Sequence, residues 1–243
     1  MKTKIMPLGA IAANCILLWD ETAPDKGCLV VDPGAEADEI AAVLDSLKLA
    51  PAAIALTHGH FDHVDAIPGL RAKWPALPIY VHPADEKMLG HPMNCYEPEY
   101  PRMEKPDNLK DVRELPGCEV IETPGHTPGV ISYFWDVEDH GKIYRAGTFG
   151  GAGMNSMRSA YIRKYHLENE DWRGAFRRSL QRAKSEKVDL FIGNHAGQNQ
   201  TPERYQRLAA GDPMAFIDPA AWGNFLNGCE ERLNQLEADD PVR

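Results

Sequence analysis

Three histidines and one aspartate fall within six consecutive positions of the stretch THGHFDH (57–63). In an extended segment, His58 and His60 lie two residues apart, so both side chains can point to one side. Asp62 continues that alternation, whereas His63 points elsewhere. Imidazole and carboxylate are the usual zinc ligands outside thiolate sites, and a catalytic zinc keeps one position open for water. The stretch is therefore suited to divide its ligands between two metal ions.

Two tetrahedral metal sites need more ligands than one short segment supplies, so distant histidines must complete them. Two histidines stand at predicted strand ends between glycines and turn residues: His126 in TPGHTPG and His195 in GNHAGQ. An isolated histidine is more often an ordinary surface or core residue. In chains of this composition, however, the pattern HxHxDH would arise by accident on the order of once per thousand. A metal site is therefore the stronger interpretation.

The rest of the chain alternates strand-like and helix-like stretches, and the histidine motifs fall where strands end. Strands are expected at 14–19, 27–32, 52–57, 77–82, 118–123, 130–137, 142–147 and 188–193. Helices are expected at 37–49, 66–74, 83–90 and 171–185, with helical spacing of apolar residues clearest in the first and last. The strand pairs 14–19 with 27–32 and 130–137 with 142–147 flank turn-like segments and predict β-hairpins. The alternation indicates the α/β class.

Length and composition describe one globular domain spanning residues 1–243. Apolar residues make up 43% of the chain, and no window offers the ~18 uninterrupted apolar residues that a membrane span needs. The net charge of −10 argues against nucleic acid, because binding to phosphates needs clustered lysine and arginine. We therefore expect a small-molecule substrate and neither a nucleic-acid nor a membrane partner, and the oligomeric state stays open.

The cysteines and the first residues bear on the cellular compartment. Five cysteines are widely spread and never form a CxxC pair, which favours a reducing compartment and a cytoplasmic location. Residues 1–18 contain two lysines followed by an apolar stretch, so export through a signal peptide is the minority alternative. Because Asn14 interrupts the stretch and no A-x-A site follows, we interpret it as a first pair of strands.

Two regions outside the histidine motifs are candidates for substrate contact. Residues 90–116 form a long, proline-rich segment, and such loops inside a compact domain are usually functional or disordered. We interpret this segment as a flap, with Met93 and Tyr96 as substrate contacts; a surface excursion without ligand contact is an equal alternative. The glycine-rich loop 150–156 should also border the cleft. The residues near it that could contact a substrate are Thr148 before the loop and Tyr161, Arg163 and Lys164 after it.

THGHFDH closely resembles the HxHxDH signature of the metallo-β-lactamase superfamily. The order of motifs over roughly residues 5–200 is also similar: VDPG after an early strand, then HxHxDH, GHTPG, and a final histidine after a late strand. The resemblance implies a four-layer αββα sandwich with metals at one edge between the sheets. It also implies that Asp32 of VDPG supports the metal loop, although a structural turn explains Asp32 nearly as well. The implied metal ligands are His58, His60 and His126 at one site, and Asp62, His63 and His195 at the other.

The chain departs from many superfamily members at one position. Superfamily hydrolases such as glyoxalase II carry a bridging aspartate after the strand that follows GHTxG, but KIYRAGTFGG places Gly147 or Thr148 there. The remaining ligand set resembles the third subclass of metallo-β-lactamases, which also lacks a bridging carboxylate. DWRGAFRRSL and VDLFIGNHAGQN are similar to that subclass's late helix and final motif, with Ala196 in place of proline. The first half resembles glyoxalase II-like thioesterases at least as well, so both assignments stay open.

The resemblance implies a dinuclear zinc hydrolase in which a metal-bound hydroxide attacks a carbonyl carbon. Asp62 would ligate one metal and orient the nucleophile by accepting its proton, which makes it the predicted catalytic residue. The substrate would be a small amide of the β-lactam type, an ester or a thioester. Because the bridging aspartate is missing, we expect two zinc ions with the second bound more weakly. The alternatives are a glyoxalase II-like thioesterase, a non-hydrolytic iron site on the same ligands, and metal binding without turnover.

Overall fold

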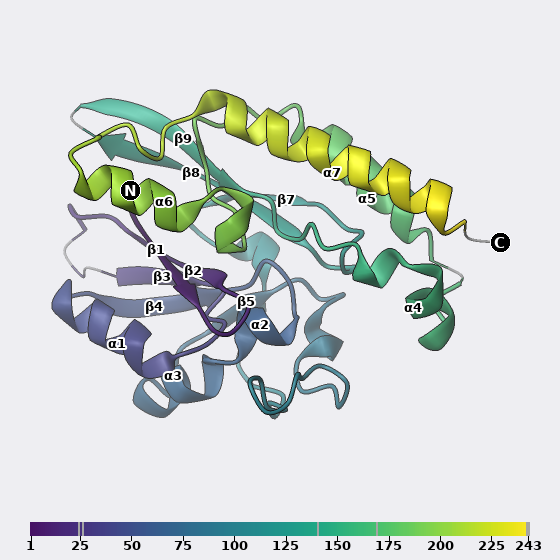
Figure 1. Ribbon diagram of the computed structural model, residues 1–243. Coiled ribbons are helices and arrows are strands. Elements are labelled where there is room, and N and C mark those ends of the chain that lie inside the picture. Colours follow the sequence, from purple (N-terminus) through teal and green to yellow (C-terminus); the bar gives the residue numbers. More distant parts are fainter. Residues whose placement is uncertain (24, 26, 140, 169, 242–243) are drawn as a thin grey trace.

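The computed structural model contains two β-sheets packed face to face, with helices on the outer face of each (Figure 1). It describes residues 1–23, 25, 27–139, 141–168 and 170–241. The order of the layers is helices, sheet, sheet, helices. This arrangement confirms the α/β class and the αββα sandwich that the sequence predicted.

The first sheet has six strands, and its outer helices arise from its parallel connections. Its strands, in spatial order, are β1 (Lys2–Leu8), β2 (Ala13–Trp19), β3 (Gly27–Val31), β4 (Ala50–Ala55), β5 (Ile79–Val81) and β6 (Leu109–Asp111). The pairs β1–β2 and β2–β3 are antiparallel, whereas β3 to β6 pair in parallel. Parallel neighbours need a crossover. The helices α1 (Ala37–Ser46) and α3 (Ile67–Lys73) supply the first two.

The second sheet has four strands and is covered by two long helices. Its spatial order is β10 (Leu190–Phe191), β9 (Lys142–Thr148), β8 (Ile131–Asp139) and β7 (Glu119–Glu122). Only the β9–β10 pair is parallel, and α5 (Trp172–Ala183) lies in the connection between those strands. The helix α7 (Pro219–Asp239) packs beside α5, and the Trp222 indole donates to the Ala183 carbonyl at 3.0 Å.

Shorter elements connect the layers. They are α2 (Phe61–Val64), α4 (Ser159–Lys164), α6 (Thr201–Ala209) and the 3₁₀ turns η1 (Glu86–Met88), η2 (Val112–Glu114), η3 (Asn155–Met157) and η4 (Ala196–Gln198). Of these, α2 matters most for function, because it directly continues the histidine motif.

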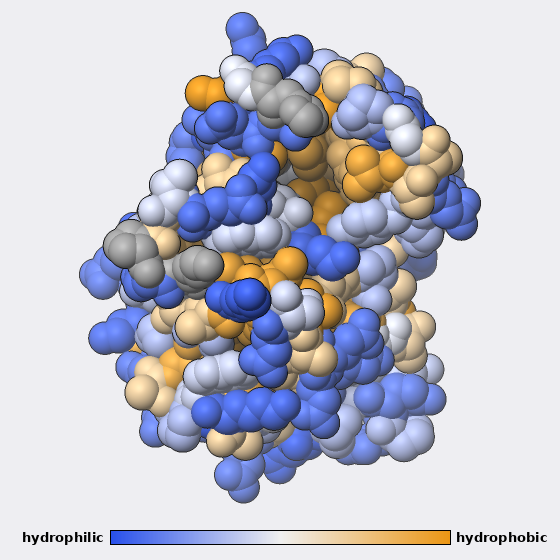
Figure 2. Space-filling model, turned by 90° about the vertical axis from the view of Figure 1, so that its left-hand side faces the viewer, coloured by the Kyte–Doolittle hydropathy of each residue, from blue (hydrophilic) through white to orange (hydrophobic). Residues whose placement is uncertain are grey.

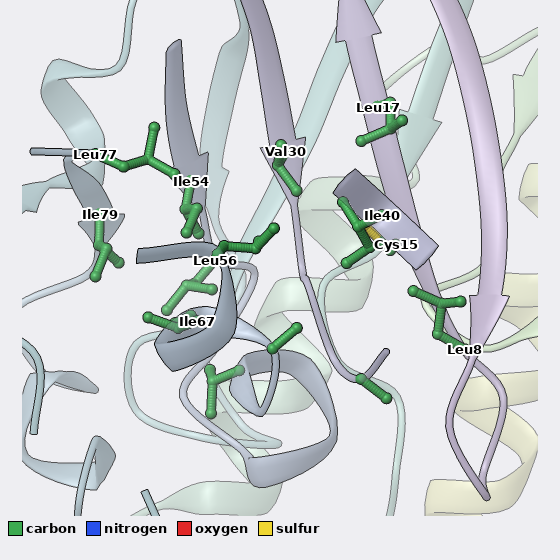
Figure 3. Close-up of a cluster of buried hydrophobic side chains, with 14 of the residues drawn as sticks. Leu8, Cys15, Leu17, Val30, Ile40, Ile54, Leu56, Ile67, Leu77 and Ile79 are labelled. Atoms are coloured by element: carbon green, nitrogen blue, oxygen red, sulfur yellow. The ribbon is translucent and has the colours of Figure 1, made fainter. Parts of the chain in front are cut away.

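Three apolar layers fill the spaces between the four structural layers, and the period-2 alternation of the strands sorts residues among them. On β2, Leu17 packs toward α1 and α3, while Ile16 and Leu18 face the second sheet. On β8, Tyr133 lies between the sheets, while Phe134 packs toward α5 and α7. Figure 3 shows the layer beneath α1 and α3, where side chains from several strands meet those helices. Burial of each large apolar side chain stabilises the fold by about 1.5–3 kcal/mol.

Most predicted elements are confirmed, with bounds that differ by a few residues. Both hairpins and the helices at 37–46, 67–73 and 172–183 are present. The strand predicted at 188–193 is reduced to Leu190–Phe191, and the helix predicted at 83–90 to a single 3₁₀ turn. The helices α4, α6 and α7 and the strand β6 were not predicted.

The segment 90–116 is not one continuous flap. Tyr100 and Met103 are buried in the layer beneath α1 and α3, and residues 109–111 form β6 at the edge of the first sheet. In the first part, Met93 and Tyr96 keep 56% and 58% of their surface exposed. The buried side chains and β6 join the later part to the sandwich, and the role of residues 91–99 as a flap stays a prediction.

The surface carries most of the polar residues. One face, shown in Figure 2, is largely hydrophilic, and apolar side chains are visible mainly in its recesses. Among the helices the structure describes, none combines the length and apolar character needed to cross a membrane. All five cysteines are free. The cytoplasmic location stays a prediction.

Candidate metal centre

The side chains that the sequence singled out come together where three strands end. His58 and His60 follow β4, and Asp62 and His63 lie in the first turn of α2. His126 follows β7, and His195 follows β10. The six residues form two groups of three, and within each group the ligand atoms lie within 4.8 Å of one another. We call the group His58, His60 and His126 the first half-site, and the group Asp62, His63 and His195 the second half-site.

The first half-site brings three imidazole rings together. The centroid of the His58 ring lies 4.8 Å from the centroids of both the His60 and the His126 rings, and the centroids of the last two rings are 4.6 Å apart. His60 Nδ1 and His126 Nε2 face each other at 3.0 Å. Three ring nitrogens therefore converge on a small volume, as a metal ion with imidazole ligands requires.

The second half-site joins one carboxylate to two rings. Asp62 Oδ2 lies 3.3 Å from His63 Nε2 and 3.4 Å from His195 Nε2. The His63 ring also lies 4.3 Å from that of His58, so the two half-sites are direct neighbours. Such a pair of adjacent three-ligand groups suits two metal ions.

Hydrogen bonds behind the rings decide which nitrogen faces the centre. Nδ1 of His126 donates to the Gly153 carbonyl at 2.8 Å, and Nδ1 of His195 donates to the Ile11 carbonyl at 3.2 Å. A carbonyl can only accept, so Nε2 of each ring is left without a proton in the neutral form. Both Nε2 atoms are thereby available to a metal.

Asp32 fixes two further rings. Its Oδ2 accepts from Nδ1 of His63 at 2.9 Å and from the Thr57 hydroxyl at 2.6 Å. The Thr57 hydroxyl oxygen in turn lies 2.9 Å from Nδ1 of His58, which therefore donates to it. The Asp32 backbone has a positive φ of 50°, so the residue also shapes the turn after β3. Both interpretations of Asp32, support of the metal loop and a structural turn, fit its geometry.

Two ring nitrogens provide the test of whether a metal fits. Within the described part of the chain, Nε2 of His58 is buried and has no hydrogen-bond partner, whereas the buried Nε2 of His63 meets the Asp62 carboxylate at 3.3 Å. Buried polar atoms are nearly always paired, so the unpaired Nε2 of His58 needs an explanation. A metal ion in the first half-site would pair this atom, and one in the second would bind the Asp62 and His63 atoms that already face each other. The residues therefore fit two metal ions.

The two half-sites differ in charge. Burial lowers the pKa of His60 to about 3 and that of His126 to about 4, and it also lowers the pKa of His58 well below its usual range. These three rings are therefore neutral near pH 7, which is the form that binds a metal.

Charge pairing dominates the second half-site. Burial opposes a charge on His63, but the Asp62 and Asp32 carboxylates raise its pKa to about 10. Burial would raise the pKa of Asp62, but the His63 and His195 rings bring it below its usual range. In the metal-free protein, Asp62 and His63 therefore form a buried ion pair near pH 7.

The glycine-rich loop 150–156 holds His126 from the other side. A Cβ atom at Gly151 would lie 2.6 Å from the His126 ring, and one at Gly153 would lie 2.9 Å from it. The Ser156 hydroxyl donates to the His126 carbonyl at 2.7 Å. The glycines do permit a close approach, as predicted, but the approach is to a ligand ring.

The predicted substrate contacts are placed very differently. Met93 and Tyr96 are exposed. The Tyr96 ring stacks on the ring of Phe61, which directly follows His60 in the chain, with centroids 6.1 Å apart. Thr148 is fully buried, and its hydroxyl has no hydrogen-bond partner among the described residues. The substrate role of Thr148 stays a prediction, and in this structure its side chain points into the interior.

Tyr161 and Lys164 lie on α4, which Figure 1 places near the carboxyl end of α7 rather than at α2. The Tyr161 ring packs on Tyr165 with centroids 4.4 Å apart, and the Lys164 ammonium lies over the same Tyr165 ring. Their substrate role stays a prediction.

Two polar residues at the centre were not predicted. Asp85 and Asn94 both follow β5 and both hydrogen-bond to the peptide of Gly59, between two ligands. In the sequence, HPADEK resembles the start of a helix, and Asn94 lies among prolines and methionines. Neither stretch carries a pattern that points to a metal site.

Comparison with known proteins agrees with the geometry. The chain matches the metallo-beta-lactamase superfamily over residues 8–190. It is 33% identical over 170 residues to the probable metallo-hydrolase YqgX of Bacillus subtilis (strain 168), which covers 62% of this chain and 78% of that protein. It is 35% identical over 130 residues to the hydroxyacylglutathione hydrolase of Xylella fastidiosa (strain M23), which covers 54% of this chain but 45% of that protein.

Solved structures show the same fold. The native FEZ-1 metallo-beta-lactamase from Legionella gormanii aligns with a TM-score of 0.76 at 21% identity, covering 95% of this chain and 91% of that one. MEM-A1, a subclass B3 metallo-beta-lactamase from a soil metagenome library, aligns with a TM-score of 0.76 at 22% identity and the same coverage. Both resemblances inferred from the sequence, to the lactamases and to the glyoxalase II-like hydrolases, are thus confirmed. The chain belongs to the metallo-beta-lactamase superfamily.

Proposed function

We propose that this protein is a dinuclear zinc hydrolase that cleaves a small substrate at a carbonyl carbon. The observation that carries the proposal is the pair of adjacent half-sites, each with three converging ligand groups, together with the buried His58 Nε2 that has no hydrogen-bond partner in the described structure. The substrate class is an amide of the β-lactam type, an ester or a thioester. The family includes metallo-hydrolases, which supports hydrolysis as the reaction.

Each half-site would hold one zinc ion through three protein ligands: His58, His60 and His126 for the first, and Asp62, His63 and His195 for the second. Three protein ligands leave a position free, which is the arrangement of catalytic rather than structural zinc. Zinc in such a site lowers the pKa of a coordinated water to about 7 and polarises a carbonyl oxygen.

Asp62 is the proposed catalytic residue. Its side chain is largely buried, and its Oδ2 faces both rings of the second half-site. The neighbouring rings lower its pKa, so the carboxylate stays ionised and can only accept hydrogen bonds. It can therefore hold an attacking water by accepting one of its protons in a hydrogen bond, and so orient the oxygen toward the substrate.

Apolar side chains next to the ligands support an organic substrate. Phe61 follows His60 directly, and the exposed Tyr96 ring stacks on the Phe61 ring. Ile11, whose carbonyl holds His195, is itself exposed. We propose that Met93 and Tyr96 contact the substrate and partly exclude water. Tyr161 and Lys164 are the second choice, as an anchor for a substrate carboxylate.

A glyoxalase II-like thioesterase is the alternative, favoured by the hydroxyacylglutathione hydrolase relative. Against it stands the placement of α7, because glyoxalase II enzymes bind the glutathione moiety with a C-terminal helical domain. In this chain Trp222, Leu226 and Leu233 are instead buried against the second sheet and α5, so α7 completes the sandwich. A non-hydrolytic iron site on the same ligands and metal binding without turnover are the remaining alternatives.

Metal analysis and a hydrolysis panel test the proposal. The purified protein should bind two zinc ions per chain and hydrolyse at least one of nitrocefin, a carbapenem, S-lactoylglutathione and simple aryl esters. A chelator should abolish the turnover, and added zinc should restore it. Turnover of S-lactoylglutathione alone would select the thioesterase alternative. Bound iron with no hydrolysis, or two zinc ions with no turnover of any substrate, would contradict the proposal.

A further inference from the structure

Asp85 is a fully buried carboxylate close to the metal centre that the proposed reaction does not use. It lies between β5 and η1, and none of its surface reaches solvent. A buried carboxylate is costly unless hydrogen bonds compensate for the lost water. Its partners therefore indicate what it is retained for.

All three partners of Asp85 belong to the loops that carry the first half-site. Oδ2 accepts from the Gly59 amide at 3.1 Å and from the Thr127 hydroxyl at 2.6 Å. Oδ1 accepts from the Gly129 amide at 2.7 Å. Gly59 lies between His58 and His60, and Thr127 directly follows His126. One carboxylate thus joins the two loops that supply all three ligands.

The steric fit around Asp85 is equally close. A Cβ atom at Gly129 would lie 2.8 Å from Cγ of Asp85, and one at Gly59 would lie 3.1 Å from the Asp85 carbonyl oxygen. Side chains at either position would push Asp85 away from the loops. The last glycine of GHTPG is therefore explained by its contact with this carboxylate.

Asn94 binds the other backbone polar atom of Gly59, its carbonyl oxygen. Its Nδ2 donates to the Gly59 carbonyl at 2.7 Å, and its Oδ1 accepts from the Phe61 amide at 3.1 Å. Asp85 accepts from the N–H of Gly59, and Asn94 donates to its C=O. Both backbone polar atoms of the residue between two ligands are therefore held.

From these contacts we propose that Asp85 is a positioning residue for the first half-site: it holds the His58–His60 loop and the His126 loop at the separation that a metal ion requires. The inference rests on the proposed function, because its consequence is metal affinity. Asp32 differs, since it contacts His63 directly and reaches His58 through Thr57. Removal of Asp85 should therefore weaken the first half-site and leave the second unchanged.

The decisive variant is Asp85→Asn, measured where only one half-site can bind. His195→Ala restricts binding to the first half-site, and His126→Ala restricts it to the second. In this variant an NH₂ group replaces one acceptor oxygen of Asp85 and faces the N–H or O–H donors of the loops. Donors do not pair with donors, so the two loops should separate. In the His195→Ala background, Asp85→Asn should raise the cobalt(II) and zinc dissociation constants about 10- to 100-fold, as loss of a ligand's hydrogen-bonding support does. In the His126→Ala background, the change should stay within about twofold.

Thr127 provides a milder pair of variants in case Asp85→Asn does not fold. Thr127→Val removes the hydroxyl that donates to Asp85, and Thr127→Ser keeps it. The valine variant should weaken the first half-site several-fold and change its cobalt(II) absorption spectrum, whereas the serine variant should restore both. Asp189→Asn is the matched control, because Asp189 also accepts a backbone amide, that of Arg145 at 2.9 Å, and its hydrogen bonds in the described structure join it to Arg145 and Asp218 rather than to the loops of the first half-site.

Three results are possible, and each is informative. First-site loss with an unchanged second site supports the inference. Folded Asp85→Asn or Thr127→Val protein with unchanged first-site affinity, or with equal loss at both half-sites, overturns it. Wild-type protein that binds no metal would instead overturn the proposed function, and the inference with it. Thermal unfolding of each metal-free variant shows which ones are folded.

Discussion

The two half-sites are neighbours but are built on different chemistry. The first consists of three neutral imidazoles, each with its pKa lowered by burial. The second contains the buried ion pair of Asp62 and His63, together with His195, whose side chain is 30% exposed. Burial thus keeps the rings of the first half-site neutral, whereas opposite charges hold the second half-site together.

This difference determines what a metal must displace. A metal entering the first half-site meets rings that are already neutral, so it displaces no proton from its ligands near pH 7. At the second half-site, His63 must lose the proton that its two carboxylate neighbours stabilise. The missing bridging aspartate is one reason to expect weaker binding at the second half-site. The proton that His63 must lose is a second reason.

The largest effect should come from Asp62→Ala, which removes the proposed catalytic group and one ligand of the second half-site only. Hydrolytic turnover should fall by about 10²–10⁴-fold or more, the usual contribution of a positioned proton acceptor. The first half-site should still bind its metal, because Asp62 is not among its ligands. Steady-state kinetics and metal analysis on the same preparation measure both effects.

Asp65→Asn is the control for Asp62→Ala, since Asp65 ends the same short helix without belonging to either half-site. It should retain turnover within a few-fold. An active Asp62→Ala protein would remove the proposed catalytic role. Loss of both metals would show that the two half-sites are not separable.

Metal removal should produce the next largest effect, on thermal stability. Zinc at 1,000 times its dissociation constant stabilises the folded state by about 4 kcal/mol per site. For a chain of this size, each kcal/mol shifts the melting temperature by about 2–4 °C. A chelator should therefore lower the melting temperature by about 8–16 °C for the tighter site alone, as calorimetry can show.

His126→Ala should remove most of this chelator effect if the first half-site is the tighter one. His195→Ala should retain it. The opposite ranking, with His195→Ala abolishing the effect, would reverse the assignment of the weaker site.

The comparison also predicts a difference in pH dependence. Carboxylates raise the pKa of His63 to about 10, so its proton stabilises the metal-free fold at neutral pH, and this contribution is lost as the pH rises through about 10. Zinc at the second half-site displaces that proton, so its affinity should rise about tenfold per pH unit between pH 7 and 9. First-site affinity should rise less steeply there, since its rings are already neutral and only coordinated water can lose a proton.

Calorimetric titration in buffers of different ionisation enthalpy measures the protons released. At pH 7.5 zinc at the second half-site should release about one proton more than zinc at the first, in addition to any proton lost from coordinated water. Equal proton release for both ions would contradict the ion pair as the distinguishing feature.

The sequence predicted the ligands of both half-sites better than their surroundings. His58 to His63 stand next to one another, and His126 and His195 stand at strand ends within recognisable motifs. Asp85 has no such signal, because its partners Gly59, Thr127 and Gly129 are 26, 42 and 44 residues away. Contacts over such separations depend on which loops the two sheets bring together, and local spacing does not encode that.

The fold was predicted where periodicity is strong and missed where single residues matter. The hairpins and α5 follow their patterns, and α7 could have been found from Trp222, Leu226 and Leu233 at helical spacing after the Asp218 cap. Segment 90–116 was misjudged because Tyr100 and Met103 are isolated apolar residues among polar ones. Their burial arises from tertiary packing alone.

The smallest expected effect concerns the substrate side of the comparison. Tyr96 stacks on Phe61 beside the first half-site, whereas Tyr161 packs on Tyr165 of its own segment. Tyr96→Ala should raise KM about 2- to 10-fold, the equivalent of one aromatic contact of about 0.5–1.5 kcal/mol, with kcat nearly unchanged.

Tyr161→Ala is the matched variant for Tyr96→Ala, because it removes an equally large ring from α4. If the substrate approaches over Phe61, the KM of Tyr161→Ala protein should stay within twofold of wild type with the best substrate of the panel. A higher KM for Tyr161→Ala together with an unchanged KM for Tyr96→Ala would move the substrate to the α4 side. Lys164 would then become the preferred anchor for a substrate carboxylate, since its ammonium lies over the Tyr165 ring on which Tyr161 packs.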